Sequence, residues 1–150
     1  FLWIFGDNIE DDMGHGRYLG FYLLCGLIAS LAHVISSAGG PNANVPSLGA
    51  SGAISGVMGA YLLLHPQRQV MVLLLRVIVN VPGYIAVGLW FVFQVISGLG
   101  ILGGGGTGGG VAYMAHIGGF VAGAILAKPF LIGRPRVRPA PDAPQADADW

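Results

Sequence analysis

A serine and a histidine, each set among small residues, are the side chains of this sequence best suited to chemistry. The serine lies directly after a turn-rich loop, in the run Gly49-Ala50-Ser51-Gly52. The histidine lies much further along the chain, in Ala115-His116-Ile117-Gly118-Gly119. A histidine that accepts the proton of a serine hydroxyl turns that hydroxyl into a nucleophile. The pair therefore predicts nucleophilic catalysis by a Ser–His unit.

The composition places this chemistry in a membrane. Of the 150 residues, 54% are hydrophobic and 9% are charged, whereas a soluble domain usually has about a quarter charged residues. Several apolar runs reach the roughly 17–25 residues that cross a bilayer. We expect a polytopic, all-α membrane protein. The net charge is zero, so nothing favours nucleic acid as a partner, and no cofactor is expected. The single Cys25 is interpreted as a packing residue.

The apolar runs predict the elements that would position the two residues. We expect helices over Tyr18–Ser37, Ser51–Leu64, Gly83–Leu99 and Val111–Ile132, separated by glycine- and proline-rich loops at residues 38–48 and 100–110. Gln67–Val81, apolar and rich in β-branched residues, is expected partly at the membrane interface. Residues 1–132 would form the transmembrane domain, and residues 133–150 a disordered cytoplasmic tail.

Two segments near the start have their own interpretation. Phe1–Phe5 reads as the last turns of a helix already under way, so we expect the chain to be a fragment that lacks an N-terminal part. Gly6–Arg17 carries four carboxylates. Their spacing fits no calcium-binding loop, so no metal site is expected, and a solvated loop is favoured.

The basic residues predict the orientation. They all fall at one set of helix ends, and the loops at the opposite ends carry no charge: Arg17, Arg68, Arg76, Lys128, Arg134, Arg136 and Arg138. The positive-inside rule puts the basic ends in the cytoplasm. Ser51 and His116 then belong to the outer half of the membrane.

Helical rise places the two residues at a similar depth. The helix runs about 20 Å from Ser51 to Leu64, and about 18 Å from His116 to Lys128. Small residues recur every four positions beside both residues, at Gly52 and Gly56 and again at Gly119 and Gly123. Such rows let membrane helices approach closely. A hydrogen bond between Ser51 and His116 is therefore expected.

The surroundings of this pair predict how the chemistry would be supported. The backbone at the head of the serine helix, at Gly49, Ala50 and Ser51, would help to stabilise an oxyanion. All seven carboxylates lie at the basic ends or in the tail, too far away to reach His116. The sequence therefore predicts a dyad without an acidic third member.

These motifs resemble those of the rhomboid family of intramembrane serine proteases. Gly49-Ala50-Ser51-Gly52 is similar to the family's nucleophile motif, and the helix with His116, Gly119 and Gly123 to its histidine helix. Phe1–Asp11 resembles the end of the second core helix and the turn after it, and Trp90-Phe91-x-x-Gln94 resembles the fifth core helix. The resemblance implies a rhomboid-like helical bundle, truncated at the N-terminus to about five of six core helices.

The resemblance also implies an activity, partners and a location. Ser51 would be the nucleophile and His116 the general base of a serine endopeptidase. Its partners would be membrane proteins with transmembrane segments, cut within the lipid bilayer through an acyl-enzyme. Trp90, Phe91 and Gln94 would lie on the helix beside the lateral substrate gate. A multi-pass protein of a bacterial inner membrane is expected, with the active site facing outward.

Two departures from the family pattern bear on this expectation. The family's oxyanion-supporting His and Asn would lie upstream of Phe1, outside this chain. Ser55 takes a position where family members often carry an aromatic residue that packs on the catalytic histidine.

Two other classes of function stay open at this point. A pseudoprotease would bind transmembrane helices without cutting them, and would be favoured by a broken dyad. A transporter would place ionisable groups along a pathway, whereas the outer half of this chain offers only histidines.

Overall fold

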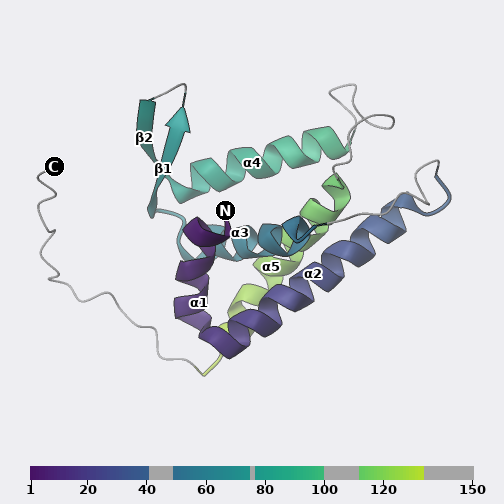
Figure 1. Cartoon of the computed structure of the whole chain (residues 1–150), viewed down its shortest axis with the longest axis horizontal. Helices are drawn as coiled ribbons and strands as arrows, with labels where there is room; N and C mark the ends of the chain where they lie inside the picture. The colour runs from purple at the N-terminus through teal and green to yellow at the C-terminus, as the bar shows by residue number, and fades with distance from the viewer. Residues whose placement is uncertain (41–48, 75–76, 100–111, 134–150) are drawn as a thin grey trace, which may run out of the picture.

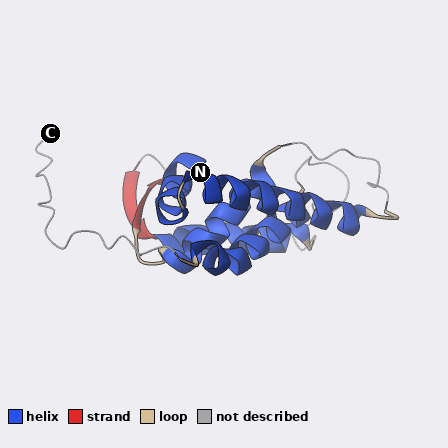
Figure 2. Ribbon diagram, turned by 90° about the horizontal axis from the view of Figure 1, so that it is seen from below, coloured by secondary structure: helices blue, strands red, loops and turns tan. Residues whose placement is uncertain are grey.

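The computed structural model shows a bundle of helices with one β-hairpin at its end (Figures 1 and 2). It describes residues 1–40, 49–74, 77–99 and 112–133. The predictions for residues 41–48, 100–110 and the tail from 134 onward lie outside the described residues. The elements are, in chain order, the π-helical turn η1 (Leu2–Gly6), α1 (Asp7–Met13), α2 (His15–Ser37), α3 (Ser51–Leu64), β1 (Gln69–Leu74), β2 (Val77–Pro82), α4 (Gly83–Gly98) and α5 (Tyr113–Leu131).

The helical bundle expected from the sequence is confirmed. Two of the described helices, α2 and α5, are long and apolar enough to cross a membrane, and α3 and α4 are shorter apolar helices. The 14 residues of α3 span about 21 Å, less than the roughly 30 Å of a bilayer core. Because α3 is too short to cross by itself, one of its ends must lie at membrane depth.

Helix α3 is the centre of the bundle. From Ser55 to Tyr61 every residue is buried, and the helix packs most extensively against α5 and then against α2. In Figure 1, α4 lies across the bundle from α2. The thiol of Cys25 on α2 is fully buried beside Gly56 of α3, as expected for a packing residue. A short helix surrounded in this way has its backbone polar groups shielded from lipid by protein.

Glycines set the distance between α3 and α5. A methyl group on Gly119 would meet the carbonyl oxygen of Gly52, and one on Gly123 would meet the carbonyl oxygen of Gly56. The two backbones therefore touch directly, which is the arrangement that small-residue rows allow in membrane helices. This contact brings the beginnings of α3 and α5 together.

The prediction of a solvated loop at Gly6–Arg17 is wrong, because most of this segment is helical. Helix α1 occupies Asp7–Met13, and α2 begins at His15 after a single break at Gly14, whose φ of 78° favours glycine. Ile9 and Met13 are fully buried. Their spacing of four residues puts both on one helical face, and burial of that face favours a helix despite the carboxylates on the others.

The stretch Gln67–Val81, expected partly at the interface, contains a secondary structure that was not predicted. Strands β1 and β2 form an antiparallel hairpin in which Val70 pairs with Val81 and Val72 with Val79. Side chains alternate between the faces of a strand. Accordingly Val70 is buried against the core while Met71 is exposed. The hairpin lies at one end of the bundle (Figure 2), beside the start of α4 (Figure 1).

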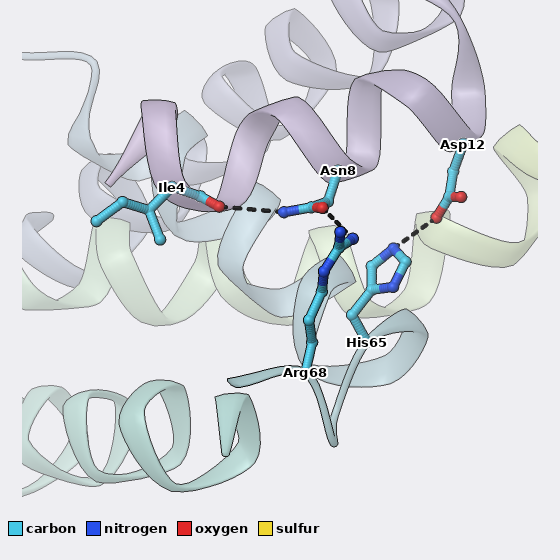
Figure 3. Close-up of polar contacts among 5 residues, drawn as sticks. All are labelled: Ile4, Asn8, Asp12, His65 and Arg68. Carbon is cyan, nitrogen blue, oxygen red and sulfur yellow. Dashed lines mark hydrogen bonds and ion pairs between the residues drawn. The ribbon is translucent and has the colours of Figure 1, made fainter. Parts of the chain in front are cut away.

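Polar side chains tie α1 to the segment that leads into the hairpin (Figure 3). His65 Nε2 lies 2.8 Å from Asp12 Oδ2. Arg68 donates to the side-chain oxygen of Asn8, and Asn8 in turn donates to the carbonyl of Ile4 at 3.1 Å. These contacts hold the end of α3 and the start of the hairpin against the acidic helix.

Another basic residue joins α2 to α5 at the same end of the bundle. Arg17 donates from Nη1 to the carbonyl oxygens of Ile132 at 2.7 Å and Phe130 at 3.3 Å. Carbonyls at the end of a helix lack partners within it, and a cation there also complements the helix dipole. The first turn of α2 thus lies beside the last turn of α5.

Candidate active site

Ser51 is the first residue of α3 and is exposed. Gly49 has a φ of 127°, in the left-handed region that favours glycine, so the chain turns sharply just before the helix. The amide of Ile54 then donates to the carbonyl of Ala50 at 3.1 Å, which opens the first helical turn. The Gly-x-Ser-Gly sequence thus places the serine hydroxyl at an accessible helix head.

His116 lies in the first turn of α5 and faces that serine. Its Nε2 is 2.8 Å from Ser51 Oγ, within the range of a hydrogen bond. The amide of His116 donates to the carbonyl of Ala112 at 3.2 Å, which fixes the start of the helix. The structure therefore brings the two residues singled out in the sequence into direct contact.

The other ring nitrogen of His116 contacts a residue of α4. Nδ1 lies 2.7 Å from Oε1 of Gln94, whose side chain is only 5% exposed. An amide oxygen can only accept, so this contact is a hydrogen bond in the tautomer that carries its proton on Nδ1. In the neutral ring Nε2 is then the acceptor, ready for the proton of Ser51. Gln94 was predicted to lie on the helix beside a substrate gate, and its contact with the histidine was not predicted.

Aromatic rings from α4 pack against the histidine and against the helix that carries it. The ring centroid of Trp90 lies 5.9 Å from that of His116, with the planes tilted by 40°. Phe91 stacks on Phe120 of α5 with centroids 4.0 Å apart. Trp90 and Gln94 are four residues apart and share a helical face. That spacing is the signal from which a common contact could have been predicted. The gate role of this helix stays a prediction.

Ser55, the other serine of the motif, has a different environment. It is 1% exposed and its hydroxyl donates to the carbonyl of Ser51 at 2.7 Å. This is a bond to the preceding helical turn, common for a serine within a helix. Of the two serines, only Ser51 presents its hydroxyl at the surface of the bundle.

The backbone at the head of α3 is suited to an anion. The first N–H groups of a helix have no partners within it, and they form the positive end of the helix dipole. Gly49, Ala50 and Ser51 are all exposed, so a substrate oxygen can approach this end. Support for an oxyanion by these residues stays a prediction.

The acidic side chains of the described residues lie away from Ser51 and His116. The carboxylates of the described residues all lie on α1, at Asp7, Glu10, Asp11 and Asp12. Within the described ranges, no three His, Cys, Asp or Glu side chains are grouped so that they could hold a metal ion. The contact between Ser51 Oγ and His116 Nε2 is the arrangement in which a histidine can activate a serine.

Comparison with known proteins agrees with this fold. The rhomboid domain matches residues 1–132, and the chain belongs to the rhomboid family. It is 37% identical over 131 residues to "Rhomboid protease GluP" of Bacillus subtilis, a match that covers 85% of this chain and 22% of that protein. It is 30% identical over 125 residues to "Rhomboid protein 1, mitochondrial" of Saccharomyces cerevisiae, covering 83% of this chain and 34% of that protein.

The chain thus spans about a fifth to a third of the length of these relatives. No solved structure matches it significantly. Family membership and the apolar helices α2 and α5 identify an integral membrane protein related to proteases.

Proposed function

We propose that this chain carries the catalytic dyad of an intramembrane serine endopeptidase, with Ser51 as nucleophile and His116 as general base. The observation that carries the proposal is the 2.8 Å contact between Ser51 Oγ and His116 Nε2 at an exposed helix head. Family membership gives the reaction class, since GluP is named a rhomboid protease. Substrates would be membrane proteins with transmembrane segments.

Acylation follows from the positions of the two side chains. Ser51 Oγ attacks the carbonyl carbon of the scissile peptide bond, and its proton passes to His116 Nε2. The carbonyl oxygen becomes an oxyanion, which the backbone N–H groups at the head of α3 stabilise. His116 then returns the proton to the leaving nitrogen, the C–N bond breaks, and an acyl-enzyme on Ser51 remains.

Deacylation repeats these steps with water. His116 Nε2 takes a proton from a water molecule, whose oxygen attacks the ester carbon. The same backbone groups stabilise the second oxyanion. The proton goes back to Ser51 Oγ as the ester bond breaks, and the carboxylic acid product leaves. Water has to reach the ester, which is consistent with the exposed position of Ser51.

The location is also part of the proposal. The end of the bundle that carries Arg17, Arg68 and Lys128 is opposite the end where α3 and α5 begin. The positive-inside rule then directs Ser51 outward and the basic end to the cytoplasm. We place the protein in a bacterial cell membrane, because one of its relatives comes from the bacterium Bacillus subtilis.

Cleavage of a transmembrane substrate by the full-length protein in lipid vesicles tests the proposal. We expect Ser51→Ala and His116→Ala each to lower the rate by about 10³-fold or more. Ser36→Ala and His15→Ala, which alter exposed residues away from the dyad, are expected to cleave at the parent rate. A folded parent that binds the substrate without cutting it would contradict the proposal and favour a helix-binding pseudoprotease.

A further inference from the structure

The contact between Gln94 and His116 occupies the place of the acidic member in a Ser–His–Asp triad. In such triads a carboxylate accepts from Nδ1–H, which holds the imidazole in the correct tautomer and orientation. Here the acceptor is an amide oxygen at 2.7 Å, on a side chain that is 5% exposed. The bond requires the proton on Nδ1 and leaves Nε2 free to accept from Ser51.

We propose that Gln94 is a positioning residue that fixes the tautomer and orientation of His116, so that the dyad is competent only while α4 is docked on α5. The inference rests on the proposed function of Ser51 and His116, and adds to it a neutral third member. It assigns Gln94 a task different from the substrate gate.

Burial explains why an amide suits this position. A carboxylate taken out of water costs several kcal/mol unless it is fully paired, whereas an amide that is hydrogen-bonded is buried at far lower cost. When His116 takes the proton of Ser51, Nδ1–H becomes a donor on a cation. Its bond to the amide oxygen strengthens at that moment, because charge-assisted hydrogen bonds are about twice as strong as neutral ones.

Helix α4 makes a second contact with His116. Trp90, one turn before Gln94, places its ring 5.9 Å from that of His116, where an aromatic face also favours a cation. With Ser55 in place of an aromatic residue on α3, α4 supplies the ring that packs on the histidine. Both supports therefore depend on one helix.

The position of α4 decides whether both supports are present. At its far end Gly98 fits closely against α5, since a methyl group there would lie 3.2 Å from Tyr113. Leu89, Val92 and Phe93 face outward and are exposed. α4 is thus attached to the bundle along one face only. Displacing it would remove the acceptor and the ring from His116 together.

The test compares histidine tautomers by ¹⁵N NMR of the full-length protein, with the His116 signals assigned by their loss in His116→Ala. We expect neutral His116 to carry its proton on Nδ1 in the parent. In Gln94→Met, which keeps the shape without the oxygen, a mixture of both tautomers is expected. Phe93→Met, the matched change on the exposed face of α4, is expected to leave the parent signals unchanged.

Kinetics supply the second measurement. Gln94→Met is expected to lower kcat about 10- to 100-fold with KM unchanged, the effect of losing one hydrogen bond to a charged group. Gln94→Glu restores an acceptor and is expected to recover most of that loss. Gln94→Asn keeps an amide but is one methylene shorter, and is expected to behave like Gln94→Met. Gln94→Asn replaces Gln94→Met in both measurements if Gln94→Met fails to fold.

The outcomes separate this inference from the proposed function. A parent that cleaves, with Gln94→Met showing the parent tautomer and kcat, would overturn the role of Gln94 alone. A raised KM with unchanged kcat in Gln94→Met would also overturn this role, because it would mean that Gln94 contacts the substrate. An inactive parent would contradict the proposed function, while the tautomer measurement would still decide whether Gln94 fixes His116.

Discussion

Gly52 of α3 and Gly119 of α5 pack backbone to backbone, with no room between them for a methyl group. Ser51 and His116 are each within a few residues of this contact. The 2.8 Å distance between Ser51 Oγ and His116 Nε2 therefore depends on how closely the two helices approach. The glycines contribute to the site through the separation of the helices and carry no reacting group themselves.

Gly119→Ala tests this dependence. The added methyl group would push the carbonyl of Gly52 away, at a cost of about 1–3 kcal/mol in stability, and we expect the rate of cleavage to fall at least about tenfold. Gly88→Ala is the control, because a methyl group on this helical glycine meets nothing within 4 Å. Thermal unfolding and cleavage rates measure both variants. Parent activity in Gly119→Ala would show that close approach is not required.

Ser55→Ala separates the two serines of the motif. It removes the bond to the carbonyl of Ser51, a loss of about 1 kcal/mol that is partly offset by the higher helix propensity of alanine. We expect near-parent stability and cleavage within a few-fold of the parent rate. The same assay on Ser51→Ala gives the contrast. If Ser55→Ala abolished cleavage and Ser51→Ala did not, the assignment of the nucleophile would be wrong.

Trp90→Ala separates packing on His116 from gating. Labelling of the serine by a small soluble probe does not require a transmembrane substrate to pass α4. We expect Trp90→Ala to slow labelling several-fold, because the ring that contacts His116 at 5.9 Å is removed. Phe93→Ala, an exposed position on the same helix, is expected to label at the parent rate. Unchanged labelling with faster substrate cleavage would instead support the gate role alone.

Cysteine accessibility tests the proposed orientation. Cys25 is fully buried, so we expect little labelling of this native thiol by a membrane-impermeant reagent. Ser36→Cys, at an exposed position near the uncharged end of α2, is expected to react with this reagent in intact cells. Gln69→Cys, at an exposed position beside the basic end, is expected to react only after the membrane is opened. The reverse pattern would contradict the outward position of the dyad.

Most of the fold follows from hydropathy. The helix at Ser51–Leu64 begins and ends where its apolar run does, and α2, α4 and α5 differ from their predicted bounds by a few residues. The hairpin was missed because a short apolar, β-branched run is ambiguous between helix and strand. Helix α1 was missed because the apolar pair Ile9 and Met13 is set among carboxylates, which favoured a loop.

The sequence predicted two residues of the site, Ser51 and His116, and missed the contact of Gln94. Ser51 and His116 stand out because their glycine motifs are local in sequence and their depth follows from helical rise. The contact of Gln94 with His116 depends on how α4 is rotated against α5. The spacing of Trp90 and Gln94 puts the two on one helical face, but no nearby residue specifies that this face turns toward His116.

The most direct test of the Ser–His dyad is labelling of the full-length protein with a fluorophosphonate probe, followed by mass spectrometry of the modified peptide. The probe phosphonylates a serine only where a base activates it. We expect one adduct, on Ser51, that is absent from both Ser51→Ala and His116→Ala. A folded parent that gains no adduct, or an adduct that persists without His116, would contradict the dyad.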